Sequence, residues 1–284
     1  MEETLKKSDL RLAISTEMQH AYQDKYRLKF WLLPPVVSDE LVLPVAAPIT
    51  SDKGDGTSGV LVGNIWGQRW LNLLRKTIRD SGTKLYWYSN GGLKVPSWLA
   101  VKIEELAEDG IFIREALPEA ELAEVLRRSS YAVVPSGTLD ETDDNVAIAR
   151  LSLPTRIPFI LASSNTPIIV IGSDKTASAR FIKRFHVGTV CDYDAARYRE
   201  AVRRVTAPEA QTKAAVQLVL GASAVAAGVS HAARGDLRYA GAAGWGLANI
   251  VVRNMIDRNR PVTLAALAGL AAVTGVTALA RRRA

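Results

Sequence analysis

The chain has 284 residues, enough for one large domain or two small ones, and its 48% hydrophobic content supports a substantial core, which excludes a disordered protein. Its formal net charge of +7 arises from 36 basic and 29 acidic residues that are interspersed, with an excess of arginine near the end. This distribution is typical of solvated helix faces and a basic tail, so we expect no nucleic-acid partner. The single cysteine excludes an internal disulfide, and the three histidines form no ligand cluster, so we expect no structural metal and a reducing compartment.

The first 37 residues predict a strand, a helix and a second strand. The apolar run Leu10–Ser15 predicts the first strand, apolar residues recur at helical spacing over residues 18–26, and Phe30–Leu33 predicts a strand that ends before two prolines. The polar stretch Ser51–Ser58 predicts a loop, so we place a boundary near residue 37 and a second region at 38–208. The charged N-terminal residues are followed by no apolar segment, which argues against a secretory signal.

Strands and helices alternate regularly from Gly59 onward. Strands are predicted at Val60–Val62, Leu85–Tyr88, Ile111–Arg114, Tyr131–Val134, Ile168–Ile171 and Thr189–Cys191. Helices are predicted at Trp70–Asp80, Trp98–Glu108, Pro118–Arg128, Thr176–Phe185 and Ala195–Val205. This alternation indicates an α/β fold, a Rossmann-like parallel sheet with helices on both faces, and ligands in such sheets bind beyond the carboxyl ends of the strands.

A turn between two of these strands has the residues of an anion site. Pro154 can stand near a helix start with little loss, and the backbone N–H groups of the first helical turn carry a partial positive charge. Arg156 opens the short apolar helix that follows and adds a planar group of permanent donors. The turn therefore favours a phosphate site; the alternative is an ordinary strand–helix–strand segment in which Arg156 caps a surface.

Four tryptophans fall within the α/β part, namely Trp66, Trp70, Trp87 and Trp98. Tryptophan is highly buried on average, so we expect these side chains in the core rather than as stacking platforms for a ligand. Lys175 and Arg180 are expected to be exposed surface cations; the alternative is that they help to stabilise a bound phosphate.

The last region, 209–284, is a hydrophobic tail. Ala214–Ala233 and Val262–Ala280 each have the length of a membrane span, and Leu237–Met255 is a weaker candidate because it contains arginine. The arginine run Arg281–Arg283 would mark a cytoplasmic flank. We therefore expect two or three hydrophobic helices that hold the protein at the cytoplasmic side of a membrane; the alternative is alanine-rich helices packed on a cytoplasmic soluble domain.

Several passages between Leu10 and Val205, about two thirds of the chain, resemble landmarks of the carboxyl-terminal, donor-binding half of GT-B glycosyltransferases. The resemblance is to the large retaining group that uses nucleotide-diphosphate sugars. Leu117–Leu122 and Tyr131–Ser136 together look like the family's passage "LPxxEL, helix, strand, PS". Ser152–Ile157 looks like its "xxPSK/R" turn, and Thr166–Ile169 looks like the "xPVV" strand that follows. Gly63–Arg69 is similar to the family's "GRLxxxK".

The resemblance implies a donor site. Its diphosphate would be held by Arg69, while Asn64 replaces the first basic residue of the motif, and Gly63 would let the backbone approach a phosphate. We assign Arg69 and Arg156 to stabilising the departing nucleoside diphosphate, with Glu141 as a third catalytic residue near the donor sugar. The acidic run Asp140–Asp144 is alternatively a solvated loop. The expected donor-binding residues are Gly63, Asn64, Arg69, Ser136, Asp143, Asp144, Pro154, Thr155 and Arg156.

The implied function is glycosyl transfer from a nucleotide-diphosphate sugar, UDP- or GDP-linked, to a saccharide or lipid-linked acceptor, with no metal required. Residues 1–37 would be a remnant of the amino-terminal domain, which in this family binds the acceptor. The protein is therefore expected to be inactive by itself if that domain is missing. The alternative is a non-catalytic nucleotide-binding or membrane scaffold module.

Overall fold

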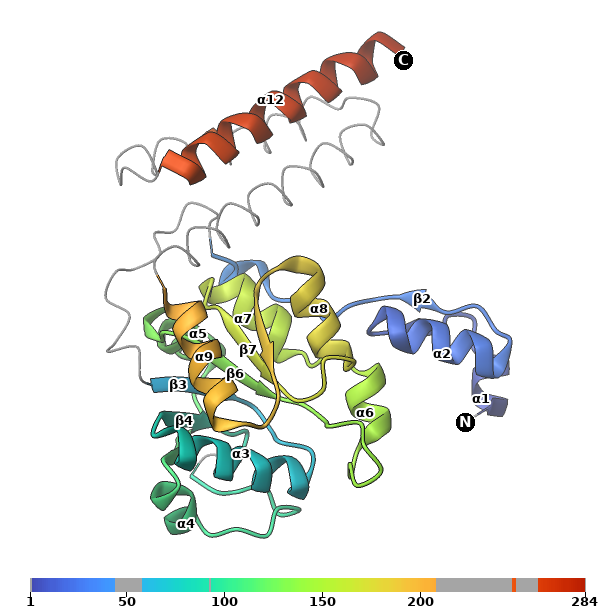
Figure 1. Ribbon diagram of the computed structural model, residues 1–284. Helices are drawn as coiled ribbons and strands as arrows, with labels where there is room; N and C mark the ends of the chain where they lie inside the picture. The colour runs from blue at the N-terminus through green and yellow to red at the C-terminus, as the bar shows by residue number, and fades with distance from the viewer. Residues whose placement is uncertain (1, 44–57, 92, 208–246, 249–259, 284) are drawn as a thin grey trace. The chain divides into compact units, whose positions relative to one another are not determined.

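The computed structural model describes residues 2–43, 58–91, 93–207, 247–248 and 260–283 (Figure 1). The chain divides into two compact units, one formed by residues 1–42 and 50–206 and the other by residues 43–49 and 207–284. The first unit contains the α/β fold. The second contains the long C-terminal helix α12 (Arg260–Arg283).

A six-stranded parallel sheet forms the centre of the first unit (Figure 1). Its strands are β3 (Ser58–Val62), β4 (Lys84–Tyr88), β5 (Ile111–Arg114), β6 (Ala132–Pro135), β7 (Ile168–Ile171) and β8 (Gly188–Cys191). Their order is β5-β4-β3-β6-β7-β8, so the chain moves outward from β3 to one edge and then returns to build outward from β6 to the other. This is the doubly wound order of a Rossmann fold, and it confirms the predicted parallel sheet.

Helices cover both faces of this sheet, as predicted. One face is covered by α3 (Gln68–Ser81), α4 (Ile103–Glu108) and α9 (Ala195–Thr206), the other by α5 (Glu119–Arg128), α7 (Arg156–Ser164) and α8 (Ala177–Phe185). Side chains of β6 alternate between the two cores: Val133 packs with the first group, Ala132 and Val134 with the second. Because both faces are buried, β6 and β7 consist of apolar residues throughout.

The N-terminal segment forms a small separate sheet. It consists of α1 (Glu2–Lys7), β1 (Leu12–Ala13), α2 (Thr16–Tyr26), β2 (Trp31–Leu32) and a 3-10 turn, η1 (Asp39–Leu41). β1 and β2 are parallel and pair only with each other. Ser15 caps α2 by accepting a hydrogen bond from the Met18 N–H, and its hydroxyl donates to the carbonyl of Leu151 at the end of α6 (Val146–Leu151).

Two local predictions were wrong. The helix expected from Trp98 begins only at Ile103, because tertiary hydrogen bonds hold the preceding residues in a turn: the Trp98 indole donates to the Ile65 carbonyl at 3.0 Å and the Ala100 N–H to Gln68 Oε1 at 2.6 Å. Helices α1 and α6 were not predicted. Each has six residues, too few to show helical periodicity.

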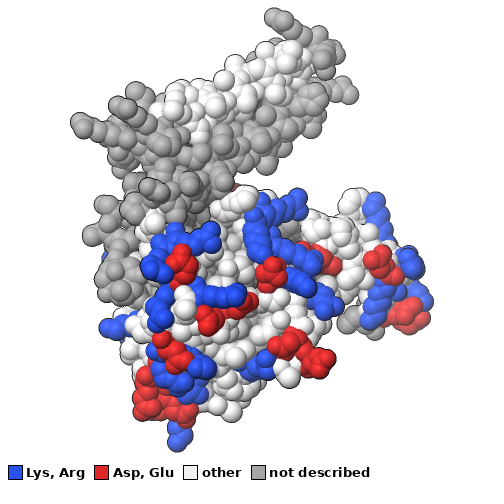
Figure 2. Space-filling model, viewed as in Figure 1, with Lys and Arg blue, Asp and Glu red and all other residues white. Residues whose placement is uncertain are grey.

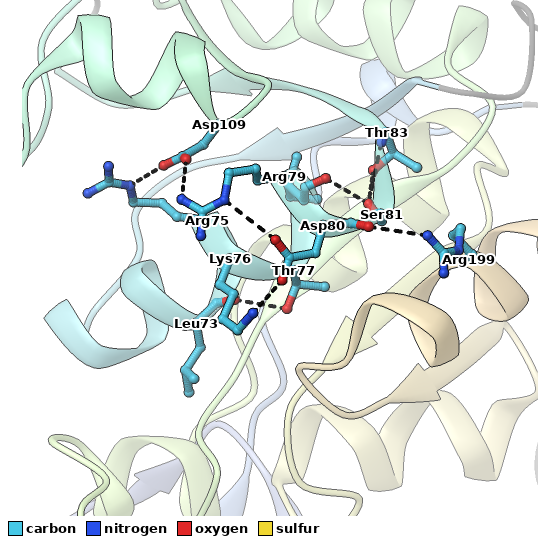
Figure 3. A network of polar contacts seen from close by, with 11 residues as sticks. Leu73, Arg75, Lys76, Thr77, Arg79, Asp80, Ser81, Thr83, Asp109 and Arg199 are labelled. Atoms are coloured by element: carbon cyan, nitrogen blue, oxygen red, sulfur yellow. Dashed lines mark hydrogen bonds and ion pairs between the residues drawn. The ribbon is translucent and has the colours of Figure 1, made fainter.

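Many cations of the first unit are engaged in structural ion pairs. Figure 3 shows Arg75 and Arg79 of α3 directed toward the buried carboxylate of Asp109, at 2.5 and 2.9 Å. Arg199 of α9 donates to the carbonyl of Asp80 at 3.2 Å, so the same network joins α3 to α9. On the face seen in Figure 2, basic and acidic residues are intermixed, with no extended surface of one sign.

In the second unit, α12 contains one stretch long and apolar enough to span a membrane, Thr263–Ala280, with a mean hydropathy of 1.8. The hydroxyls of Thr274 and Thr277 donate to backbone carbonyls four residues earlier in the helix, so these polar groups are satisfied within it. The predicted segment Ala214–Ala233 lies outside the described residues, as does Leu237–Met255 except for residues 247–248. The described part therefore contains one such helix where two or three were predicted.

Candidate functional site

The candidate site lies at the carboxyl edge of the sheet, where the strand order reverses. β3 and β6 are neighbours in the sheet. The helix that follows β3, α3, packs on one face, whereas α7, the first long helix after β6, packs on the other. In open α/β sheets, ligands bind outside the strand ends at this point. All residues predicted from the sequence lie on three segments here, residues 63–69, 136–144 and 154–156.

Gly63 and Asn64 form the turn after β3 and contact Arg156. Gly63 has a φ of +80°, a left-handed conformation that favours glycine, and its carbonyl accepts a hydrogen bond from the Trp87 indole at 2.7 Å. A Cβ atom at Gly63 would lie 3.8 Å from Cζ of Arg156. The Arg156 Nη2 donates to the carbonyl of Asn64. The turn after β3 and the start of α7 are therefore in direct contact.

Arg156 forms no ion pair with a carboxylate of the described residues. Its Nη1 is shielded from solvent and has no hydrogen-bond partner among them. Burial lowers the pKa of Arg156 from 12.5 to about 10, which still leaves the guanidinium charged at neutral pH. A partly buried cation without a counter-charge among the described residues is costly to the fold, and such groups concentrate at functional sites.

Helix α7 adds to this positive environment. Its N-cap residue, Thr155, is exposed and makes no side-chain hydrogen bond to the first turn. Pro154 accepts a hydrogen bond from the Ile157 N–H at 3.0 Å and so forms the turn that begins the helix. The helix dipole and the Arg156 side chain thus favour an anion at the same place.

Arg69, by contrast, is balanced by the acidic turn. Its Nη2 lies 2.9 Å from Asp140 Oδ2, and its backbone N–H donates to Asp144 Oδ2 at 2.9 Å. Asp144 thereby caps α3, whose N-cap residue, Gly67, has no side chain. Hydrogen bonds from Thr142 lower the pKa of Asp140, so this carboxylate is ionised at neutral pH. A phosphate at the start of α3 would have to displace these carboxylates.

Asp143 holds the acidic turn in place. It accepts hydrogen bonds from the Trp70 indole at 2.8 Å, the Leu139 N–H at 2.8 Å and the Asn145 N–H at 3.0 Å. The Asp143 carboxylate is therefore engaged by other groups of the protein. Glu141 lies exposed in the same turn.

Ser136 is also directed inward. Its side chain is buried, its N–H donates to the Ile171 carbonyl of β7 at 2.8 Å, and its own carbonyl accepts a hydrogen bond from the Tyr193 hydroxyl at 2.7 Å. The structure thus brings Gly63, Asn64 and Arg156 into one contact, at the turn after β3, and Arg69, Asp140 and Asp144 into another, at the start of α3.

The expectation that all four tryptophans are buried was wrong for two of them. Trp70 and Trp87 lie in the core, but Trp66 and Trp98 are 48% and 49% exposed. Both exposed side chains are in loops, where hydrophobic periodicity gives no information about burial. The only sequence signal was that Trp66 precedes Gly67 and that Trp98 lies two residues after Pro96.

Neither a protein-family model nor a curated protein matches the sequence. Within the described ranges, no group of three or more His, Cys, Asp or Glu side chains could hold a metal ion. An open cavity of about 640 Å³ lies along the edge strand β8 and helix α9, lined in part by Asp192, Arg197 and Glu200, and contains none of the predicted site residues.

Proposed function

We propose that this protein is a glycosyltransferase-like protein, built on the donor-binding half of a GT-B fold, that binds a nucleotide-diphosphate sugar at the switch point between β3 and β6. The observation that carries the proposal is Arg156, a shielded guanidinium with an unpartnered Nη1 and no carboxylate beside it in the described part of the chain. It lies against a left-handed glycine and at an uncapped helix start. A pyrophosphate supplies the missing negative charge and the hydrogen-bond acceptor.

In this proposal Arg156 stabilises the charge that develops on the departing nucleoside diphosphate. Arg69 is the second cation, and its contribution depends on release from Asp140, 2.9 Å away. Glu141 and Asp140 lie on the β6 side, where carboxylates can accept hydrogen bonds from donor-sugar hydroxyls. The acceptor is a saccharide or a lipid-linked saccharide.

We also propose that the hydrophobic tail holds the protein at the cytoplasmic side of a membrane. The apolar stretch of α12 and the two predicted segments, Ala214–Ala233 and Leu237–Met255, support this, because each has the length or composition of a span. The hydroxyls of Thr274 and Thr277 in α12 are satisfied within the helix, as the bilayer interior requires.

A second candidate, a non-catalytic nucleotide-binding module, is favoured by a specific observation. Asp143 and Asp144 are engaged with α3 and the loop itself, which leaves fewer groups for donor-sugar contacts than the sequence suggested. The two candidates share the anion site and differ in turnover.

The test is thermal denaturation of the full chain in detergent with UDP-, GDP- and ADP-sugars, because a ligand that binds only the folded state raises its melting temperature. We expect stabilisation by at least one donor and its loss in Arg156→Ala, whereas Arg150→Ala, which removes an exposed arginine, retains it. Donor hydrolysis separates the enzyme from the binding module. No stabilisation by any donor would contradict both.

A further inference from the structure

Two exposed tryptophans form a stacked pair in the loops that follow β3 and β4. The rings of Trp66 and Trp98 have centroids 5.5 Å apart and planes inclined by 8°, and about half of each side chain is exposed. Trp66 lies in the turn between β3 and α3, and Trp98 in the connection between β4 and α4. An exposed pair of large aromatic rings at the carboxyl edge of the sheet is a surface suited to a ligand with a flat ring.

Neighbouring residues hold the two tryptophans in position. The neighbouring side chains Ile65 and Leu99 are buried, at 1% and 6% exposure, and anchor the two loops in the core. The Trp98 indole donates to the Ile65 carbonyl at 3.0 Å, and Asn145 Nδ2 donates to the Trp66 carbonyl. The rings therefore need little ordering when a ligand binds, which lowers the entropic cost of binding.

One member of the pair, Trp66, is close in sequence to the group that binds Arg156. Asn64, whose carbonyl accepts the Arg156 hydrogen bond, precedes Trp66 by two residues in the same turn. Trp98 follows β4, on the opposite side of β3 from the acidic turn that follows β6. The site thus has aromatic rings on the loops after β3 and β4, and carboxylates, Asp140 and Glu141, on the loop after β6.

We propose that the Trp66–Trp98 pair stacks on the nucleobase of the nucleotide whose pyrophosphate lies against Arg156. This inference rests on the proposed function. Every nucleobase has a π face that stacks on an aromatic side chain, whereas the hydroxyls of a sugar are better matched to the carboxylates of the β6 side. Stacking tolerates different bases, so the pair strengthens binding of UDP and GDP alike.

The test is isothermal titration of the full chain in detergent with pyrophosphate, glucose 1-phosphate, UDP and GDP. In Trp66→Ala and in Trp98→Ala, we expect affinity for UDP and GDP to fall about tenfold, with pyrophosphate and glucose 1-phosphate unchanged. Trp98→Phe should lose less of the affinity for UDP and GDP than Trp98→Ala, because it keeps an aromatic face.

The matched control is Trp31→Ala. Trp31 is 52% exposed and lies on β2, with the Lys29 ammonium 3.7 Å from its ring centroid. All four affinities should be unchanged in this variant. Unchanged pyrophosphate affinity in the Trp66 and Trp98 variants shows that they are folded.

The outcomes separate the two proposals. If pyrophosphate binds and Arg156→Ala abolishes its binding, but the tryptophan variants retain wild-type affinity for UDP and GDP, the stacking inference is wrong and the anion site stands. A fall in glucose 1-phosphate affinity equal to that of the nucleotides would assign the pair to a sugar and also overturn the inference. If neither pyrophosphate nor nucleotides bind the wild-type chain, both proposals fail.

Discussion

Replacing Arg156 by methionine should make the ligand-free protein more stable. Lowering the pKa of a guanidinium from 12.5 to about 10 corresponds to about 3 kcal/mol by which the charged form disfavours the folded state. The substitution removes this cost together with one hydrogen bond, to the Asn64 carbonyl, worth about 1 kcal/mol. Methionine is flexible enough to fill the space of the aliphatic stem. The net expectation is stabilisation by about 2 kcal/mol.

Thermal denaturation at pH 7 with and without pyrophosphate measures this effect. Without ligand, Arg156→Met should melt about 4–8 °C above wild type. With saturating pyrophosphate the order should reverse, because only wild type gains from the ligand. Arg150→Met, a change at an exposed arginine, should leave both measurements unchanged.

The pH dependence provides a second measurement with a defined sign. Between pH 10 and 12.5 the unfolded chain binds a proton at Arg156 that the folded chain has released, so this residue makes stability rise with pH in that window. The difference between wild type and Arg156→Met should therefore narrow as pH increases through 10. If Arg156→Met destabilises the ligand-free protein at pH 7, the guanidinium is already compensated and the argument for an anion site is refuted.

Asp109→Asn should destabilise the protein by about 2 kcal/mol in urea denaturation, because two arginines of α3 then face a buried group without charge. Asp80→Asn, at a more exposed carboxylate, should have a smaller effect. Equal effects would contradict the role of burial. Burial raises the pKa of Cys191 to about 12, so its thiol should resist a maleimide at pH 8 until the protein is unfolded in urea; rapid labelling of the folded protein would show that it is accessible. Asp140→Asn frees Arg69 and should raise pyrophosphate affinity several-fold in titration, and a decrease would show that Asp140 itself contributes to binding.

Local pattern was sufficient to predict most of the secondary structure. The strands β5 and β7 have the predicted ends, and α8 begins after Thr176, whose side chain accepts a hydrogen bond from the Ala179 N–H as a cap does. These features depend on the order of apolar residues and on caps within a few residues, which are visible in the chain itself. The regular alternation also sufficed for a parallel sheet with helices on both faces.

Only the tertiary structure decided which of the two arginines is paired with a carboxylate and which tryptophans are exposed. Arg69 and Arg156 look equivalent in the sequence, but folding places Asp140 beside the first and no carboxylate of the described residues beside the second. Trp66 and Trp70 are four residues apart, yet one is exposed and the other buried. Helices and strands depend mainly on neighbours along the chain, so the sequence alone predicts them. Burial and charge balance depend on residues that are distant in sequence and come into contact only in the folded protein.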